Sequence, residues 1–323
     1  MSVVVPMFNE AAAIPVFLET LREVLTEERI RFEIVFVNHG STDATVDLLI
    51  GALRDDARLR LVNLSRNFGM EAALTAGIEA ARGDVVIPMD ADLQDSPALV
   101  PAFLDRWRAG YDAVYGVRAA RHEDGLLKRT TAGFFYRVFN RLSDTGIPAN
   151  AGDFRLMDRR VEALRQCRER NRFMKGLFSW VGFSATGLAY ERPRRPAGRT
   201  KWRYWNLWNF AIDGLTGFTT APLRIWTYVG ALLALISFLY ALVIVLQVLV
   251  EGIRVPGYAS LITVVLSLGG MQLLSLGLVG EYLGRLFAES KARPIYLVEG
   301  VYDGGEAPAG EGASGHRPLE SRR

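Results

Sequence analysis

Two long uncharged segments near the C-terminal end of the chain limit most strongly what it can fold into. Thr227–Val250 spans 24 residues and Val255–Gly280 spans 26, and neither contains a charged side chain. Because a helix rises about 1.5 Å per residue, each segment is long enough to cross a hydrocarbon layer about 30 Å thick. We therefore predict a C-terminal two-helix transmembrane hairpin over residues 227–280. Two core helices of a soluble protein are the weaker alternative, because buried helices of this length normally carry a polar stripe.

The charged residues around these segments predict their orientation. Glu251-Gly252-Ile253-Arg254 forms the short connection, whereas Arg224, Arg285 and Lys291 flank the outer ends. Because the cytoplasmic ends of membrane helices carry an excess of Lys and Arg, we expect a multi-pass protein of the cell (inner) membrane. Its N-terminal domain and both termini are then cytoplasmic. The first residues lack a basic segment followed by an apolar one, so we expect no cleaved signal sequence.

The composition leaves room for one further domain. A chain of 323 residues can form a core of about 200 residues beside the hairpin. The single cysteine, Cys167, excludes an intramolecular disulfide and suits a reducing compartment. The net charge of +3 is small, and basic residues cluster at 192–203 and around the apolar segments. This distribution fits an anionic membrane surface rather than nucleic acid.

Short runs rich in β-branched residues alternate with helical segments in the first part of the chain. This alternation predicts an α/β domain over residues 1–202, with a mostly parallel sheet and helices on both faces. The expected strands are Val3–Val5, Glu33–Val37, Arg60–Asn63, Asp84–Met89 and Ala113–Val117. The expected helices are Ile14–Leu25, Thr45–Leu53, Met70–Ala81 and Ala98–Arg108.

Three further segments are predicted around the hairpin. Residues 203–226 contain Trp205 and Trp208 and few charges, which favours amphipathic helices at the membrane interface. Residues 281–300 are expected to form a cytoplasmic return segment. Residues 301–323 are rich in Gly, Ala, Glu and Pro without periodicity, and we expect a disordered tail.

Polar side chains follow the expected strands at their carboxyl ends. These residues are Asn9 and Glu10 after the first strand, Asn38–Asp43 after the second, Asp90–Asp95 after the fourth and Arg118 after the fifth. Parallel α/β sheets bind their ligands beyond these ends. We therefore expect the side chains to converge on one site.

Asp90-Ala91-Asp92 is the expected chemical centre of that site. Two carboxylates at i and i+2 beyond a buried strand can present oxygens to one divalent cation, and Mg²⁺ and Mn²⁺ prefer such ligands. The cation could hold a diphosphate and neutralise the charge that develops as it leaves. Gln94 could complete the ligand shell. An isolated pair of this kind is also common in loops and helix caps, and Asp95-Ser96-Pro97 does look like a helix start.

Five ordered motifs carry a resemblance to a known family. They are Val5–Glu10, Val37–Asp43, Ser65–Gly69, Met89–Asp95 and Gly152–Arg155. Together with the hairpin, they resemble the family 2 glycosyltransferases of the polyprenyl-phosphate type, which include bactoprenol glucosyltransferases and dolichol-phosphate mannosyltransferases. The resemblance covers residues 2 to 298, including Gly280–Arg285 and Arg293–Tyr296.

This resemblance implies a GT-A nucleotide-sugar domain that uses Mg²⁺ or Mn²⁺. It implies an inverting transfer of a sugar from a nucleotide-sugar to polyprenyl (undecaprenyl) phosphate at the cytoplasmic membrane face, by a homotetramer. UDP-glucose is the favoured donor, because residues 281–296 most resemble the bactoprenol glucosyltransferases. GDP-mannose, UDP-galactose and UDP-aminoarabinose remain alternatives, and a non-catalytic membrane scaffold is the alternative from another class.

The resemblance also assigns roles to matching residues. The residues expected in catalysis are Asp92, Asp153 and Arg118. Those expected to bind the nucleotide-sugar are Pro6, Asn9, Glu10, His39, Asp90, Gln94 and Lys201. The lipid phosphate is assigned to Arg118, Arg129 and Arg137, and the metal to Asp90, Asp92 and Gln94.

His39 departs from the family pattern. The usual motif after the second strand reads N-D-G-S-T-D, and His39 replaces its first acidic residue, which normally contacts the nucleotide. An imidazole can donate or accept one hydrogen bond but lacks the paired acceptors of a carboxylate. Altered donor preference and a tolerated substitution are both open.

Asp153 matches the acid that the family places near the acceptor. A phosphomonoester has a second pKa of about 6 and is already largely dianionic at neutral pH. Orienting the acceptor is therefore as plausible a role for Asp153 as removing a proton. A structural ion pair with Arg155 or Arg118 is the third possibility.

Overall fold

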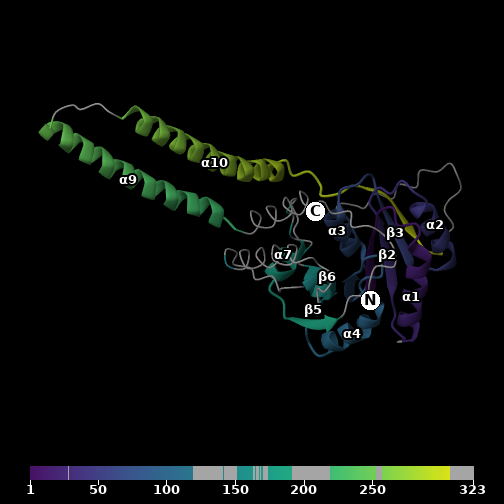
Figure 1. Cartoon of the computed structure of the whole chain (residues 1–323). Helices are drawn as coiled ribbons and strands as arrows, with labels where there is room; N and C mark the ends of the chain where they lie inside the picture. Colours follow the sequence, from purple (N-terminus) through teal and green to yellow (C-terminus); the bar gives the residue numbers. More distant parts are fainter. Residues whose placement is uncertain are drawn as a thin grey trace.

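The computed structural model describes residues 1–27, 29–118, 141, 151–162, 164, 167, 169, 174–190, 219–251 and 257–305. Within these ranges the chain forms an α/β domain and two long helices that project from it (Figure 1). The predictions for Arg129, Arg137 and Lys201 lie outside the described residues, as does most of the expected interfacial segment, at 203–218.

An eight-stranded sheet forms the centre of the domain in the described residues, with strand order β7-β5-β6-β4-β1-β2-β3-β8. β1 pairs in parallel with β2 and β4, β2 with β3, and β5 with β7, whereas β6 and β8 run antiparallel to their neighbours. The strands are β1 (Ser2–Met7), β2 (Glu33–Asn38), β3 (Leu59–Leu64), β4 (Val85–Pro88), β5 (Ala113–Arg118), β6 (Ala151–Asp158), β7 (Ala185–Tyr190) and β8 (Val298–Asp303). The five predicted strands are confirmed, and the sheet is mostly parallel as expected.

Helices cover both faces of the sheet, also as predicted. They are α1 (Ile14–Glu27), α2 (Thr45–Asp55), α3 (Met70–Ala80), α4 (Val100–Arg108) and α7 (Met174–Trp180), with a short 3-10 helix at Pro97–Leu99 before α4. Successive strand residues point to opposite faces. In β1, Val3 and Val5 therefore pack with α1, α2 and α4, whereas Val4 packs with α3 and α7. All three valines are fully buried.

Helix α3 packs closely against the sheet. It presents small residues to β1 and β2, among them Ala73, Ala76 and Gly77. A Cβ atom added at Gly77 would lie 2.2 Å from Cγ1 of Val4 and 3.0 Å from Cγ2 of Val37. The close approach of this helix therefore depends on the absence of a side chain at Gly77.

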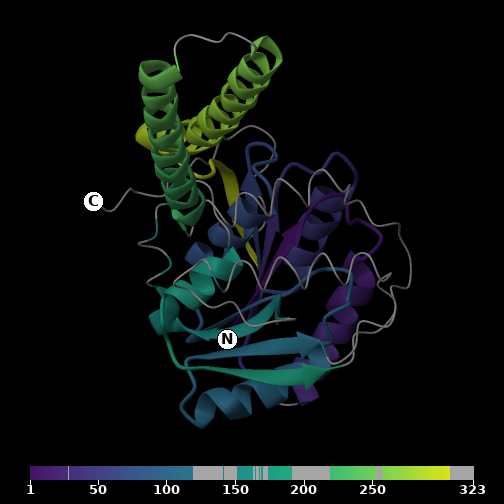
Figure 2. The same ribbon diagram turned by 60° about the vertical axis from the view of Figure 1, so that its left-hand side comes forward.

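Two long helices, α9 (Ala221–Glu251) and α10 (Tyr258–Ser290), form the predicted hairpin (Figures 1 and 2). Both extend beyond the predicted spans at their outer ends. At the base of the hairpin, the Tyr282 hydroxyl donates a hydrogen bond to the backbone oxygen of Thr219 at 2.9 Å. Among the described residues, Leu223–Tyr240 is the segment long and apolar enough to cross a membrane, and none of it is buried. Both membrane crossings stay predictions.

The end of the chain differs from the sequence prediction. Residues 301–303, assigned above to a disordered tail, form the second half of β8, and α10 continues ten residues beyond the predicted span, to Ser290. β8 pairs with β3, and Arg60 Nε lies 2.5 Å from Asp303 Oδ1. The short run Val298–Asp303 contains a glycine and two acids, so its strand character depends on a partner far away in the sequence.

We predict that Gly77→Ala destabilises the domain by about 1–3 kcal/mol, because the added methyl overpacks a filled interface. Gly51→Ala is the matched control. Gly51 lies in α2 with no atom within 4 Å of an added Cβ, so alanine there should raise stability by about 0.5–1 kcal/mol. Thermal unfolding of the full chain measures both, and equal melting temperatures for the two variants would contradict the predicted close packing.

Candidate functional site

The carboxyl ends of the central strands meet at one edge of the sheet. β1 lies between β4 and β2 and is parallel to both, so the winding of the chain reverses direction between β1 and β4. Doubly wound sheets bind ligands at such a reversal. The loop after β1, with Asn9 and Glu10, and the loop after β4, with Asp90 and Asp92, flank this position. Half-buried Pro6, in β1, pairs with Val37 of β2.

Asn9 joins the loop after β1 to the loop after β2. Its backbone N–H donates to the Ser41 hydroxyl oxygen at 2.9 Å, and its side-chain oxygen accepts from the Thr42 N–H at 2.8 Å. Asn9 has a φ of 55°, in the left-handed region that asparagine tolerates better than most residues. The side-chain oxygen of Asn9 therefore braces the loop after β2, and the contact of Asn9 with a nucleotide stays a prediction.

A second set of contacts joins the same two loops at the start of α2. The Glu10 N–H donates to the Thr45 hydroxyl oxygen at 3.1 Å, and the Ala11 N–H donates to Asp43 Oδ2 at 3.3 Å. The Thr45 N–H donates to Asp43 Oδ1 at 3.1 Å. A hydrogen bond from the Thr45 side chain is the main cause that lowers the pKa of the Asp43 carboxyl. The two loops are thus held together by backbone donors and side-chain acceptors.

His39 is buried beside the loop after β3. Its ring stacks on Phe8 with centroids 5.2 Å apart, and its Nδ1 lies 3.4 Å from Oδ1 of Asn67. Burial is the main cause that lowers the pKa of His39, so the neutral ring is favoured. The Asn67 oxygen also accepts from the Gly69 N–H at 2.8 Å. The structure therefore places His39 among three loops, and its contact with a nucleotide stays a prediction.

Gly40 allows the loops after β2 and β3 to approach each other. Its φ is +87°, and an added Cβ would lie 2.7 Å from the backbone nitrogen of Asn67. Both the left-handed backbone and the close approach exclude a larger residue at this position.

The loop after β4 holds the two expected metal ligands. Asp90 and Asp92 are half-buried, and Asp92 Oδ1 accepts from the Gln94 N–H at 3.1 Å. Leu93 between them and Gln94 has a φ of 54°, which is uncommon for a residue with a bulky side chain. Gln94 is 8% exposed, so its side chain points largely into the protein.

Tyr190 anchors the far end of this loop. Its hydroxyl donates to Oδ1 of buried Asp95 at 2.7 Å. Tyr190 is the last residue of β7 and pairs with Arg118, the last residue of β5. β6 runs antiparallel to both β4 and β5, so its first residues, including Asp153, lie toward the same edge. The strands thus bring the backbones of Arg118 and Asp153 to the site.

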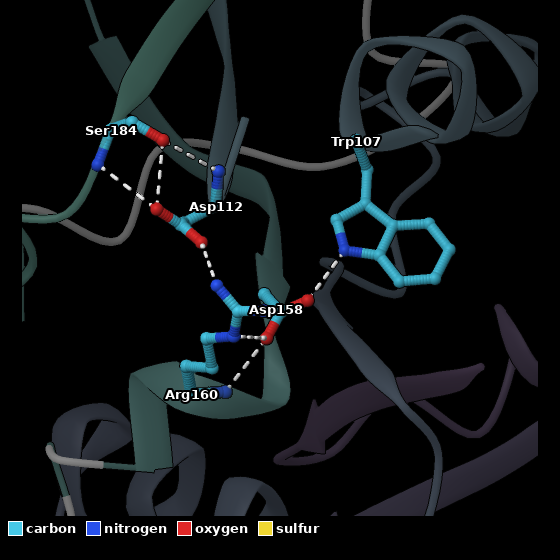
Figure 3. A network of polar contacts seen from close by, with 5 residues as sticks. All are labelled: Trp107, Asp112, Asp158, Arg160 and Ser184. Carbon is cyan, nitrogen blue, oxygen red and sulfur yellow. Dashed lines mark hydrogen bonds and ion pairs between the residues drawn. The ribbon is translucent and has the colours of Figure 1, made fainter. Parts of the chain in front are cut away.

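A separate polar network ties the opposite edge of β5, β6 and β7 together (Figure 3). The Ser184 hydroxyl donates to Asp112 Oδ2 at 2.8 Å, and the Trp107 indole N–H donates to Asp158 Oδ2 at 2.6 Å. The Arg160 side chain lies within 3.9 Å of both carboxylates. Because Asp112 and Ser184 precede β5 and β7, this network is remote from the Asp90 loop and stabilises the sheet.

The carboxylate oxygens in the loop after β4 suit a cation that also binds the phosphates of a ligand. Among the described residues, no group of three or more His, Cys, Asp or Glu side chains is arranged to hold a metal ion. Mg²⁺ is commonly held by one or two carboxylates, with phosphate and water oxygens completing the octahedron. Asp90 and Asp92 could supply the two carboxylates of such a site, with phosphate and water oxygens as the other ligands.

Sequence reasoning identified the strand-end residues but missed their supports. Ser41, Thr45, Asn67 and Tyr190 hold the loops in place. The first three lie within or beside the motifs, whereas Tyr190 lies outside them and had no sequence signal. These contacts join loops that follow different strands, and a local sequence pattern cannot predict them.

The sequence matches the family described as Glycosyl transferase family 2 over residues 2–164, and the GtrB C-terminal hairpin over residues 221–286. The chain therefore belongs to glycosyl transferase family 2 and is a glycosyltransferase with a GT-A-like sheet and a GtrB-type hairpin.

Relatives match over nearly their whole length. The glycosyltransferase sll0501 of Synechocystis sp. is 50% identical over 94% of this chain and 95% of its own length. The bactoprenol glucosyl transferase of Shigella phage SfV is 47% identical over 92% of this chain and 97% of its own. The solved glucosyl-3-phosphoglycerate synthase of Mycobacterium tuberculosis, in complex with Mn²⁺, UDP-glucose and phosphoglyceric acid, is 19% identical, with a TM-score of 0.44 over 67% of this chain and 77% of that one.

We predict that His39 makes the stability of the fold sensitive to acid. The unfolded chain protonates this ring near its ordinary pKa of about 6.5, whereas the folded chain resists protonation because its pKa is lowered. The free energy of unfolding therefore falls as the pH drops through this ordinary pKa, because protonation then favours the unfolded chain. The melting temperature of wild type should fall more steeply between about pH 7 and about pH 5.5 than that of His39→Gln.

His316→Gln, in the stretch expected from the sequence to be a tail, is the matched control and should keep the wild-type slope. Identical slopes for His39→Gln and wild type would contradict the assignment of this acid sensitivity to His39.

Proposed function

We propose that this glycosyltransferase transfers glucose from UDP-glucose to a polyprenyl phosphate at the membrane surface. The observation that carries the proposal is the position of Asp90 and Asp92 at the winding reversal of the sheet, in a chain that continues into a GtrB-type hairpin. The name of the phage SfV relative, a bactoprenol glucosyl transferase, supports glucose as the sugar and a polyprenyl phosphate as the acceptor.

The acceptor supplies its own nucleophile. A phosphomonoester oxygen attacks the anomeric carbon from the face opposite the leaving diphosphate, so the product is inverted. Because the second pKa of such a phosphate is about 6, no strong base is required. The work of the protein is then to align the two substrates and to stabilise the departing diphosphate.

Asp90 and Asp92 would hold Mg²⁺ or Mn²⁺ together with the donor diphosphate. The bound cation supplies stabilisation of negative charge on the leaving group. Asp92 already accepts a hydrogen bond from the Gln94 N–H, which fixes the direction of its carboxylate. We assign to Gln94 a supporting role in holding this loop rather than direct ligation, because its side chain is buried.

Basic residues would bind the phosphates of the two substrates. We assign Arg118, at the end of β5, to the reacting phosphates, and Arg129, Arg137 and Lys201 to the lipid phosphate or the diphosphate. Guanidinium groups bind phosphate oxygens in pairs and suit this role. Pro6, Glu10 and the braced Asn9 loop would form the wall of the nucleotide site.

The two long helices would insert in the membrane with both chain termini in the cytoplasm. Their apolar side chains are largely exposed, as Leu249 at 77% and Leu273 at 72% illustrate. Apolar surface of this extent requires cover by lipid or protein. Arg224 and Lys291, at the outer ends of the helices, support a cytoplasmic location for those ends.

Replacing Asp92 tests the proposed function. Asp92→Ala should lower the transfer of radiolabelled glucose from UDP-glucose to undecaprenyl phosphate by about 10³-fold, because cation-assisted departure of the diphosphate is lost. Asp55→Ala, at the exposed end of α2, is the control and should retain activity within about twofold. Transfer that persists in Asp92→Ala, or a wild type that transfers no glucose, would refute the proposal.

Replacing Asp153 separates orientation from base catalysis. Asn retains hydrogen bonding but cannot take up a proton. We expect Asp153→Asn to raise the acceptor KM while kcat falls by less than about tenfold, since the acceptor is already dianionic. A fall in kcat of about 10³-fold with an unchanged acceptor KM would instead assign Asp153 as the base.

A further inference from the structure

A row of hydrogen bonds runs from β8 across the sheet to the loop after β2 and from there to the loop after β1. Asn63 Nδ2 in β3 donates to Glu299 Oε2 in β8 at 2.8 Å, and Asn63 Oδ1 accepts from Asn38 Nδ2 in β2 at 2.6 Å. Asn38 Oδ1 accepts from the Ser41 N–H at 3.1 Å, and the Ser41 hydroxyl accepts from the Asn9 N–H at 2.9 Å. The row therefore ends at the Asn9 loop, which we assigned above to the wall of the nucleotide site.

The two ends of the row fix the direction of every bond in it. A carboxylate such as Glu299 only accepts, and a backbone N–H such as that of Ser41 only donates. Each amide between them must therefore turn its NH₂ toward β8 and its oxygen toward the loop. Reversing either amide would place one hydrogen-bond donor against another and one acceptor against another. Because Asn38 is only 3% exposed, water could not replace the lost partner.

The segment just before Glu299 is attached to the domain, although the Glu299 side chain itself is exposed. Residues 291–297 connect the end of α10 to β8, and Figure 2 shows this connection reaching the domain from the long helices. The Ser65 N–H donates to the Leu297 oxygen at 3.0 Å, and the Tyr296 hydroxyl donates to Glu79 Oε2 at 2.6 Å. The start of β8 thus carries Glu299 to a defined place on the edge of β3.

We propose that Glu299 and Asn63 are positioning residues for the nucleotide-sugar donor. The strand β8, which follows the hairpin in the chain, thereby completes the binding site of this donor. They act through Asn38, which holds Ser41 and so the Asn9 loop in the geometry that binds the nucleotide. The inference rests on the proposed function for the assignment of that loop. The row does not include Asp90 or Asp92, so its loss weakens donor binding and leaves the chemical step intact.

Asn63→Asp tests this inference in the full chain. The new carboxylate cannot donate to Glu299 and is repelled by its negative charge, which displaces it from its contact with Asn38. The KM for the nucleotide-sugar and the dissociation constant of UDP should therefore rise about tenfold, with kcat within about twofold of wild type. Adding Glu299→Gln removes the repulsion and supplies an amide that donates to the new carboxylate, so that this carboxylate can again accept from Asn38. This double variant keeps the net charge of the pair and should restore both constants to within about twofold of wild type.

Asp303→Asn is the control for a merely structural effect. Asp303 also lies in β8 and pairs with buried Arg60, but it is not part of the row. It should lower the melting temperature while the donor KM stays within about twofold. A rise in donor KM equal to that of Asn63→Asp, or a double variant as weak as Asn63→Asp alone, would overturn the inference.

Calorimetry of UDP binding distinguishes the two proposals. A wild type that binds UDP but transfers no glucose refutes the proposed function alone. Unchanged UDP affinity in Asn63→Asp refutes the positioning role alone, whereas a wild type that does not bind UDP refutes both.

Discussion

Parallel pairing of β1 with β2 on one side and β4 on the other is the constraint on which the site depends. Val4, buried at the centre of β1, pairs in register with Val35 and Pro88. This register brings the ends of three strands, and therefore Asn9, the Ser41 loop and Asp90, to the same edge of the sheet. The pairing is secured on one face by α3, whose close approach requires Gly77, and on the other by α1 and α4.

The loops at this edge are held by hydrogen bonds between backbone donors and side-chain acceptors. Asn9, Asp43 and Thr45 supply acceptors to N–H groups of neighbouring loops, so these backbone groups are satisfied without regular structure. Such bracing reduces the conformational freedom that a ligand would otherwise have to remove on binding. Tyr190 braces the Asp90 loop through a bond between two side chains, from its hydroxyl to Asp95.

The chain that follows the hairpin is part of the domain's sheet rather than a flexible linker. After α10 the chain returns as β8 and becomes an edge strand of the sheet, where it covers β3. Covering an edge strand protects its hydrogen-bonding groups from other chains. It also places Glu299, in the segment that follows the hairpin, within hydrogen-bonding reach of Asn63, which in turn contacts Asn38.

Local patterns in the sequence were sufficient for five strands, four helices and the hairpin, because each of these elements shows its own periodicity or length. They were also sufficient to place Asp90, Asp92 and Asn9 at strand ends. They were insufficient for β6, β7 and β8, which carry glycines and polar residues within short runs. These strands are stabilised by pairing, and β3, the partner of β8, lies far earlier in the chain.

The class of fold, the family and the residues that end each central strand could be read from the sequence, since these depend on patterns within short stretches of chain. The contacts that those residues make could be read only from the folded chain. It showed that the Asn9 oxygen braces a loop, that His39 is buried beside Asn67, and that Glu299 reaches the row ending at Ser41. Each of these contacts joins segments that are distant in the chain, and such pairings follow from strand register, which no local pattern contains.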